Sequence, residues 1–217
     1  VGSSLGTTTC ISITDGRAIT VGEEGIASSI GGVTWYSQGT SIYTTDVSGT
    51  DSSANNNYGI GSTALDAITT GDDNIGLGFN ALGALTTGIR NTAIGSNASG
   101  AYDAENDNIA IGIDVLSGSV NGGEFNICIG NYVGDGLTSG DSNTAIGHNC
   151  MTAAVVGDYN VTVGRDSLAS ITDADSNVAV GYKAALSIST GDNNICIGRE
   201  AGVTGSPGGN LTTGRRM

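Results

Sequence analysis

The sequence predicts an all-β protein, a parallel β-solenoid or β-roll built from about nine coils of 17 residues. Two observations carry this prediction. A five-residue phrase, consisting of Asn, any residue, a small residue, an aliphatic residue and Gly, recurs nine times, and no stretch has the periodicity of a helix. Glycine accounts for 37 of the 217 residues and aromatic residues for only 5%, so a conventional core of large side chains is not expected.

The nine copies of the phrase follow one another at a constant spacing. Each step is 17 residues except for one of 18, where the turn GSVNGGEFN holds an extra residue. Successive coils of a sheet lie about 4.8 Å apart, so nine coils would form a rod on the order of 43 Å long. The copies begin at Asn57, Asn74, Asn91, Asn108, Asn126, Asn143, Asn160, Asn177 and Asn194.

Each copy of the phrase predicts a short strand followed by a sharp corner. The second residue of the phrase is β-branched in eight copies of nine, and the fourth residue is always Ile, Leu or Val. These two positions give the strand one apolar face. The residue between them is Gly, Ala, Cys or Thr, so the opposite face is expected to meet a close neighbour. The final Gly suits a corner because glycine adopts positive φ without strain.

The rest of each coil has its own pattern. Two mostly polar positions follow the corner, as at His148–Asn149, and are expected to face solvent. A second apolar pair, as at Ala64–Leu65 or Ala81–Leu82, predicts a second short strand. A Gly-Asp turn, as at Gly191–Asp192, then leads into the next Asn, whose side chain is expected to hydrogen-bond nearby backbone.

The period divides the chain into two predicted parts, an N-terminal β module over residues 1–54 and the solenoid over residues 55–217. In the module, RAITVGEEG (Arg17–Gly25) is similar to the NVTVG phrase, and the alternation in WYSQGTSIY (Trp35–Tyr43) predicts one or two ordinary strands. An open solenoid end exposes unpaired strand edges, so the module is interpreted as a cap. Attachment to a larger assembly is the alternative.

Charge and hydropathy exclude several classes of partner. The net charge of −14, with only seven Lys plus Arg, provides no basic stripe for nucleic acid or for an anionic membrane. The longest apolar runs are a handful of residues, whereas roughly 20 are needed to span a bilayer. We therefore expect no nucleic-acid partner and no membrane insertion.

No catalytic, cofactor-binding or metal-ligating residue is expected. The string GLGFNALG (Gly76–Gly83) is similar to a dinucleotide loop, but its glycines fall in the repeat columns and no helix is predicted after it. The cysteines have no zinc-ligand spacing with the single histidine, His148, and are interpreted as buried free thiols. They are Cys10, Cys128, Cys150 and Cys196.

An acidic column lies two residues before the repeated Asn. Stacked coils would bring these carboxylates near one another along one edge, at steps of about 4.8 Å. Either they are solvated turn residues or a cation such as Ca²⁺ bridges them, since calcium prefers oxygen ligands. A glycosidase needs two carboxylates in unlike environments, whereas a ladder gives each the same environment, so the chain is not expected to be an enzyme. The column includes Asp72, Glu124, Asp141, Asp158, Asp175 and Asp192.

A single coil of 17 residues, with small residues lining one face, is too thin to bury much apolar area. Association of several chains around a common axis, most simply three, is therefore expected.

The repeats also resemble those of known proteins. The phrases NTAIGSNA (Asn91–Ala98) and STGDNNICIG (Ser189–Gly198) are similar to the repeats of bacteriophage tail and capsid fibres, cyanophage fibres among them, and to the head domain of YadA-like trimeric autotransporter adhesins. Both groups imply a trimeric, left-handed parallel β-roll over roughly Asn55 to Gly214. The tail SPGGNLTTG (Ser206–Gly214) resembles what often precedes a C-terminal chaperone in such fibres.

The fibre resemblance implies a structural protein at the virion surface. Its partners would be two further copies of the chain, other virion proteins, and a glycan or protein of the host surface. The alternative is the head of a bacterial adhesin that binds extracellular ligands, although the repeat unit of that family is usually a few residues shorter than 17.

Overall fold

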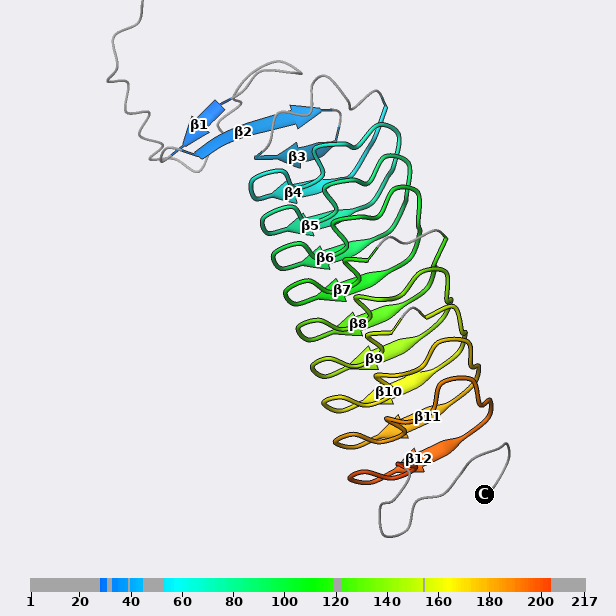
Figure 1. Cartoon of the computed structure of the whole chain (residues 1–217). Helices are drawn as coiled ribbons and strands as arrows, with labels where there is room; N and C mark the ends of the chain where they lie inside the picture. Colours follow the sequence, from blue (N-terminus) through cyan, green and yellow to red (C-terminus); the bar gives the residue numbers. More distant parts are fainter. Residues whose placement is uncertain are drawn as a thin grey trace, which may run out of the picture.

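The computed structural model describes residues 28–30, 33–38, 40–44, 53–118, 122–153 and 155–203. Within these ranges there is no helix, and one 12-stranded sheet runs in sequence order along an elongated solenoid (Figure 1). Neighbouring strands from β3 to β12 are parallel. The predicted all-β solenoid with a 17-residue period is confirmed, and the nine repeated strands mark the limits of eight full turns.

The first three strands, β1 (Ser28–Ile30), β2 (Val33–Gln38) and β3 (Ser41–Tyr43), are antiparallel neighbours. The strands expected within WYSQGTSIY are therefore present. Strand β3 also pairs in parallel with β4, so it covers the edge of the first coil, as an end cap would. The segments Arg17–Gly25 and Ser206–Gly214 lie outside the described residues.

The repeated strands are three residues each and stack in strict register, so that equivalent positions of successive coils lie opposite one another. Ala145, for example, pairs with Cys128 on one side and with Thr162 on the other. The strands are β4 (Tyr58–Ile60), β5 (Ile75–Leu77), β6 (Thr92–Ile94), β7 (Ile109–Ile111), β8 (Ile127–Ile129), β9 (Thr144–Ile146), β10 (Val161–Val163), β11 (Val178–Val180) and β12 (Ile195–Ile197).

The small central residue of each strand faces the interior of its own coil. Ala93, Ala145 and Ala179 are completely buried, whereas the flanking residues of every repeated strand are half-buried or exposed. A Cβ built on Gly76 would lie 2.9 Å from the carbonyl oxygen of Ala81, so the two sides of a coil are nearly in backbone contact. The close neighbour expected beside the small residues is therefore the far side of the same coil.

The second apolar pair does not form the second strand expected in each coil. In the first coil Ala64–Leu65 lies in a run of turns: the amide of Ala64 donates to the carbonyl of Gly61 at 3.3 Å, and that of Ile68 to Leu65 at 3.3 Å. Stacking between coils still occurs, because the amide of Leu65 donates to the carbonyl of Ala81 at 3.2 Å. The prediction of a second strand was wrong because the chain must reverse within these few residues, and tight turns achieve this where an extended strand cannot.

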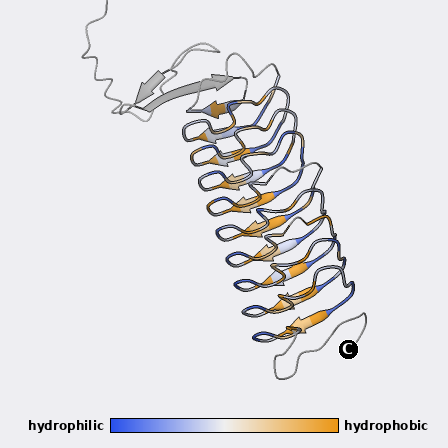
Figure 2. Cartoon of the chain, viewed as in Figure 1, coloured by the Kyte–Doolittle hydropathy of each residue, from blue (hydrophilic) through white to orange (hydrophobic). Residues whose placement is uncertain are grey.

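The leucines of these turns fill the coil interior. The buried apolar side chains of successive coils belong to one hydrophobic core, and Figure 2 shows hydrophobic residues recurring from coil to coil along the solenoid. Its largest fully buried aliphatic members are Leu65, Ile68, Leu82, Leu85, Leu116, Leu137, Met151, Leu168 and Ile171.

The reversal depends on left-handed backbone at several positions of every coil. The corner glycines have φ between +121° and +155°, which confirms the predicted corner. Three further positions of each coil have left-handed backbone and are mostly occupied by residues other than glycine. They are the residue before the repeated Asn, the second residue after the corner Gly, and the fourth residue after the corner Gly. Examples are Phe125, Lys183 and Leu82, with φ of 58°, 55° and 53°.

The repeated asparagines form a buried ladder parallel to the axis. The amide of Asn160 donates to Oδ1 of Asn143 at 2.9 Å, and Nδ2 of Asn143 donates to the carbonyl of Gly157 at 2.9 Å. The same pattern links Asn74 to Asn57 and to Gly88. These bonds all join an Asn to the neighbouring coil. The predicted bond from Asn to its own nearby turn is present at Asn108, Asn177 and Asn194.

Candidate functional site

The acidic column is held by the backbone of neighbouring coils. A carboxylate oxygen of Asp158 accepts from the amide of Asp141 at 2.7 Å, and one of Asp175 accepts from the amide of Asp158 at 2.8 Å. Asp192 continues the series by accepting from the amide of Asp175 at 2.9 Å. These bonds stabilise the stacked turns whether or not a cation is bound. Across the described ranges, no group of three or more His, Cys, Asp or Glu side chains is arranged to hold a metal ion.

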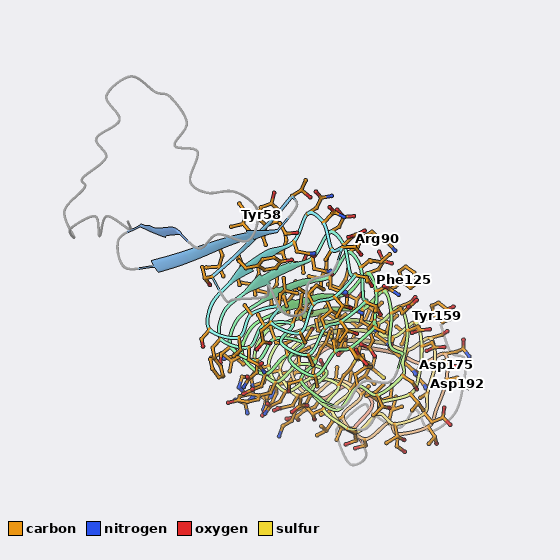
Figure 3. All side chains as sticks on the ribbon, turned by 90° about the horizontal axis from the view of Figure 1, so that it is seen from above. Tyr58, Arg90, Phe125, Tyr159, Asp175 and Asp192 are labelled. Atoms are coloured by element: carbon orange, nitrogen blue, oxygen red, sulfur yellow. The ribbon has the colours of Figure 1, made fainter. Side chains whose placement is uncertain are left out.

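The edge that carries the acidic column also carries exposed aromatic residues and an ion pair. Figure 3 shows Arg90, Phe125, Tyr159, Asp175 and Asp192 along this edge. Nε of Arg90 lies 2.6 Å from Oδ1 of Asp107, one coil further on. The hydrogen bond from the guanidinium of Arg90 lowers the pKa of the half-buried Asp107 carboxyl. A surface ion pair of this kind stabilises the fold by at most about 1 kcal/mol.

In the C-terminal coils, the corner after the strand carries cationic side chains around an aromatic ring. The ring of Tyr182 is approached by three cations from successive coils: Arg165 at 5.3 Å, Lys183 at 5.2 Å and Arg199 at 5.7 Å from the ring centroid. These are three of the four Lys and Arg residues in the described part of the chain. We call Arg165, Tyr182, Lys183 and Arg199 the cation cluster.

Two carboxylates offset part of this positive charge. Arg165 pairs with Asp166 at 3.1 Å and Arg199 with Glu200 at 3.4 Å, while Lys183 has no salt bridge in the described residues. The hydrogen bond to Asp166 raises the pKa of Arg165, whose charge is therefore permanent. The cluster has a net positive charge on a chain whose net charge is −14.

The corner positions were expected only to face solvent, and this holds for Arg165 and Arg199, which are exposed, but Tyr182 and Lys183 are half-buried. The cation cluster was not predicted, although Arg165, Lys183 and Arg199 stand at nearly the same position of three consecutive repeats. Two coils earlier in the same corner, the rings of Tyr132 and His148 meet edge to face, with centroids 5.8 Å apart.

Three of the four cysteines are free and buried, as predicted, and Cys10 lies outside the described residues. Cys128 and Cys196 occupy the small interior column, where Ala is the commonest residue. Burial raises the pKa of the Cys128 thiol strongly and that of Cys150 to about 12. Since the thiolate is the reactive form, both side chains are inert packing residues in the folded protein.

Alkylation of the intact chain with iodoacetamide at pH 8 should leave Cys128 and Cys150 almost unmodified. Their raised pKa values keep the thiols neutral at this pH, and unfolding in guanidinium should make both fully reactive. Cys196, in the last described coil, should react before Cys128 because the ends of a solenoid open more readily than its middle. Peptide mass spectrometry measures each site, and modification of native Cys128 at the unfolded rate would contradict the interior assignment.

No protein-family model, curated protein or solved structure matches the chain. Among the described residues, no helix has the length and apolarity needed to cross a bilayer.

Proposed function

We propose that the chain is a structural segment of a trimeric virion fibre, in which three solenoids associate side by side and project from the particle surface. The observation that supports this proposal is the outer face of the sheet. The first and third residues of strands β4–β12, which we call the outer strand face, are almost all β-branched or aromatic and point away from the coil interior.

The outer strand face is apolar along the whole described solenoid. Ile60, Ile94, Ile146 and Val163 are each 37–42% exposed. No described element covers this face, although contiguous exposed apolar patches are rare on soluble monomers and mark interaction surfaces. Burying the face would compensate for the thin core of each coil.

A second and a third copy of the same chain fit this face. The face repeats every 17 residues, so copies aligned in parallel present apolar residues to one another at every coil. Closed association around a threefold axis lets each chain contact both neighbours and leaves no free apolar face. The resemblance to phage fibre repeats favours the same arrangement.

Replacing Ile146 with glutamate tests this surface. In an assembled trimer the new carboxylate would be buried without a partner, which costs several kcal/mol and should raise the concentration for half-dissociation by at least about a hundredfold. Phe79→Glu is the matched control, because Phe79 is 56% exposed but lies at the corner, off the outer strand face. Sedimentation velocity with circular dichroism separates loss of assembly from loss of fold.

The expected result is a folded monomer for Ile146→Glu and an assembled protein for Phe79→Glu. If both variants keep the mass of the unmodified protein, the outer strand face is not the contact between chains.

A further inference from the structure

A groove of about 520 Å³ runs along the corner of four successive coils. This volume is within the range of about 300–1,000 Å³ that small-molecule sites occupy. One wall consists of the second residues after the corner glycines, and the other of the residues three positions further on. The lining residues are Tyr132, Asp135, Asn149, Thr152, Asp166, Ala169, Lys183 and Leu186.

The groove contains an acceptor that the protein itself leaves unused. Oδ1 of Asp135 is buried and has no hydrogen-bond partner among the described residues. A buried acceptor without a partner is unfavourable, so a donor that reaches the Asp135 carboxylate would stabilise the folded chain. Asn149 and Thr152, from the next coil, line the groove beside it and supply further hydrogen-bonding groups. A ligand rich in hydroxyl groups would satisfy this set.

The two ends of the groove differ in chemistry. Tyr132 lies in the first lining coil and is 41% exposed, so its ring offers an apolar surface on which another ring can stack. Lys183 lies in the last lining coil and also belongs to the cation cluster. Arg165 and Arg199 lie one coil before and after it, but each is paired with a carboxylate, Asp166 and Glu200, and Asp166 also lines the groove. An acid group at this end would therefore meet a net positive charge centred on Lys183, which has no salt bridge among the described residues.

We infer that this groove binds an acidic polysaccharide. Sugar hydroxyls donate to the carboxylate of Asp135 and bond to Asn149 and Thr152, a sugar ring stacks on Tyr132, and the acid group of the sugar pairs with Lys183. The gathering of cations on an otherwise acidic chain favours an anionic ligand, and the polar groove favours a hydroxylated one. The inference rests on the proposed function, because it gives the fibre a surface ligand.

The test is binding of oligogalacturonate to the full chain, measured by isothermal titration calorimetry. Neutral maltoheptaose and a short polyglutamate peptide are titrated alongside. Lys183→Asn should weaken oligogalacturonate binding about tenfold, and Tyr132→Asn should weaken it as well. Both positions have left-handed backbone, and Asn is tolerated there because Asn80 and Asn149 occupy the same column with φ of 54°.

Arg90→Asn is the matched control. It also removes one positive charge at a left-handed position, with φ of 59°, in a column where Asn56 occurs naturally, but it lies at the opposite end of the strand from the groove. This variant should bind within twofold of the unmodified chain. Raising the salt concentration should weaken binding, since exposed charge pairs are screened.

Four results would overturn the inference: no binding of oligogalacturonate, equally tight binding of maltoheptaose, equally tight binding of polyglutamate, or equal effects of Lys183→Asn and Arg90→Asn. Sedimentation of the same samples keeps the two proposals apart. A trimer that fails to bind contradicts the groove alone, and a monomer that binds contradicts the fibre alone.

Discussion

Asn143→Ala is expected to lower the free energy of unfolding by roughly 2–5 kcal/mol. The side chain accepts from the amide of Asn160 and donates to the carbonyl of Gly157, both at 2.9 Å and both buried. Alanine would leave that amide and that carbonyl without a partner inside the coil, and each unsatisfied buried group costs about 1–3 kcal/mol. Thermal unfolding followed by circular dichroism at equal chain concentration measures the effect.

The matched control for this substitution is Asn55→Ala. Asn55 is exposed, and its side-chain amide donates to the carbonyl of Ser53 outside the buried ladder. The free energy of unfolding should therefore change by no more than about 0.5 kcal/mol, as for most surface substitutions. Equal losses in the two variants would mean that the ladder does not carry the stability of the stacked turns.

Gly95→Ala is expected to have an even larger effect, above about 4 kcal/mol, and to disrupt stacking of the central coils. Gly95 has φ of +132°, and a Cβ at this position would overlap the carbonyl oxygen of Gly112 in the next coil. The backbone around Gly112 cannot move away without breaking the register of the sheet, so the strain cannot be relieved locally.

Gly198→Ala separates the two causes of the expected loss of stability, which are backbone strain at positive φ and the clash with the next coil. Gly198 has a similar φ of +121°, but a Cβ there would meet no described atom within 4 Å, because no further described coil follows. Only the backbone strain of about 1–3 kcal/mol should remain. Comparable loss of thermal stability in the two variants would show that the contact between coils is unimportant.

The sequence alone was enough to predict the period, the strand positions and the glycine corners. The repeated phrase carries them directly, because a three-residue strand and its corner lie within five consecutive residues. The buried asparagines were only partly predicted. A hydrogen bond from Asn to its local turn is common, whereas the bond to the neighbouring coil depends on exact stacking, which becomes visible only in three dimensions.

Some of the left-handed positions could have been predicted from the sequence. The second position after the corner is Asn at residues 80, 97 and 149 and Asp at residues 114 and 166, and these two residue types tolerate positive φ better than others. The column of Leu65 and Leu82 carried no such signal, because leucine rarely adopts this conformation. Their apolar character therefore indicated a strand, and the packing of the coil interior determined a turn instead.

The groove and the cation cluster were not predicted because they depend on residues that differ between coils. The repeat pattern emphasises the columns that all coils share, whereas Tyr132 and Lys183 are each unique at their position and Arg199 shares its residue type with one other coil, at Arg165. Ligand binding on a repetitive scaffold depends on such departures from the repeat. The single Lys of the chain is one of them.

Sedimentation equilibrium of the unmodified 217-residue chain tests the central claim most directly. A trimer has three times the mass of the 21.4 kDa chain, about 64 kDa, and this is the result expected if the outer strand faces pack against one another. A folded monomer of 21.4 kDa, with the circular dichroism of a β protein at micromolar concentration, would contradict the proposal that the solenoid functions as part of a trimeric fibre.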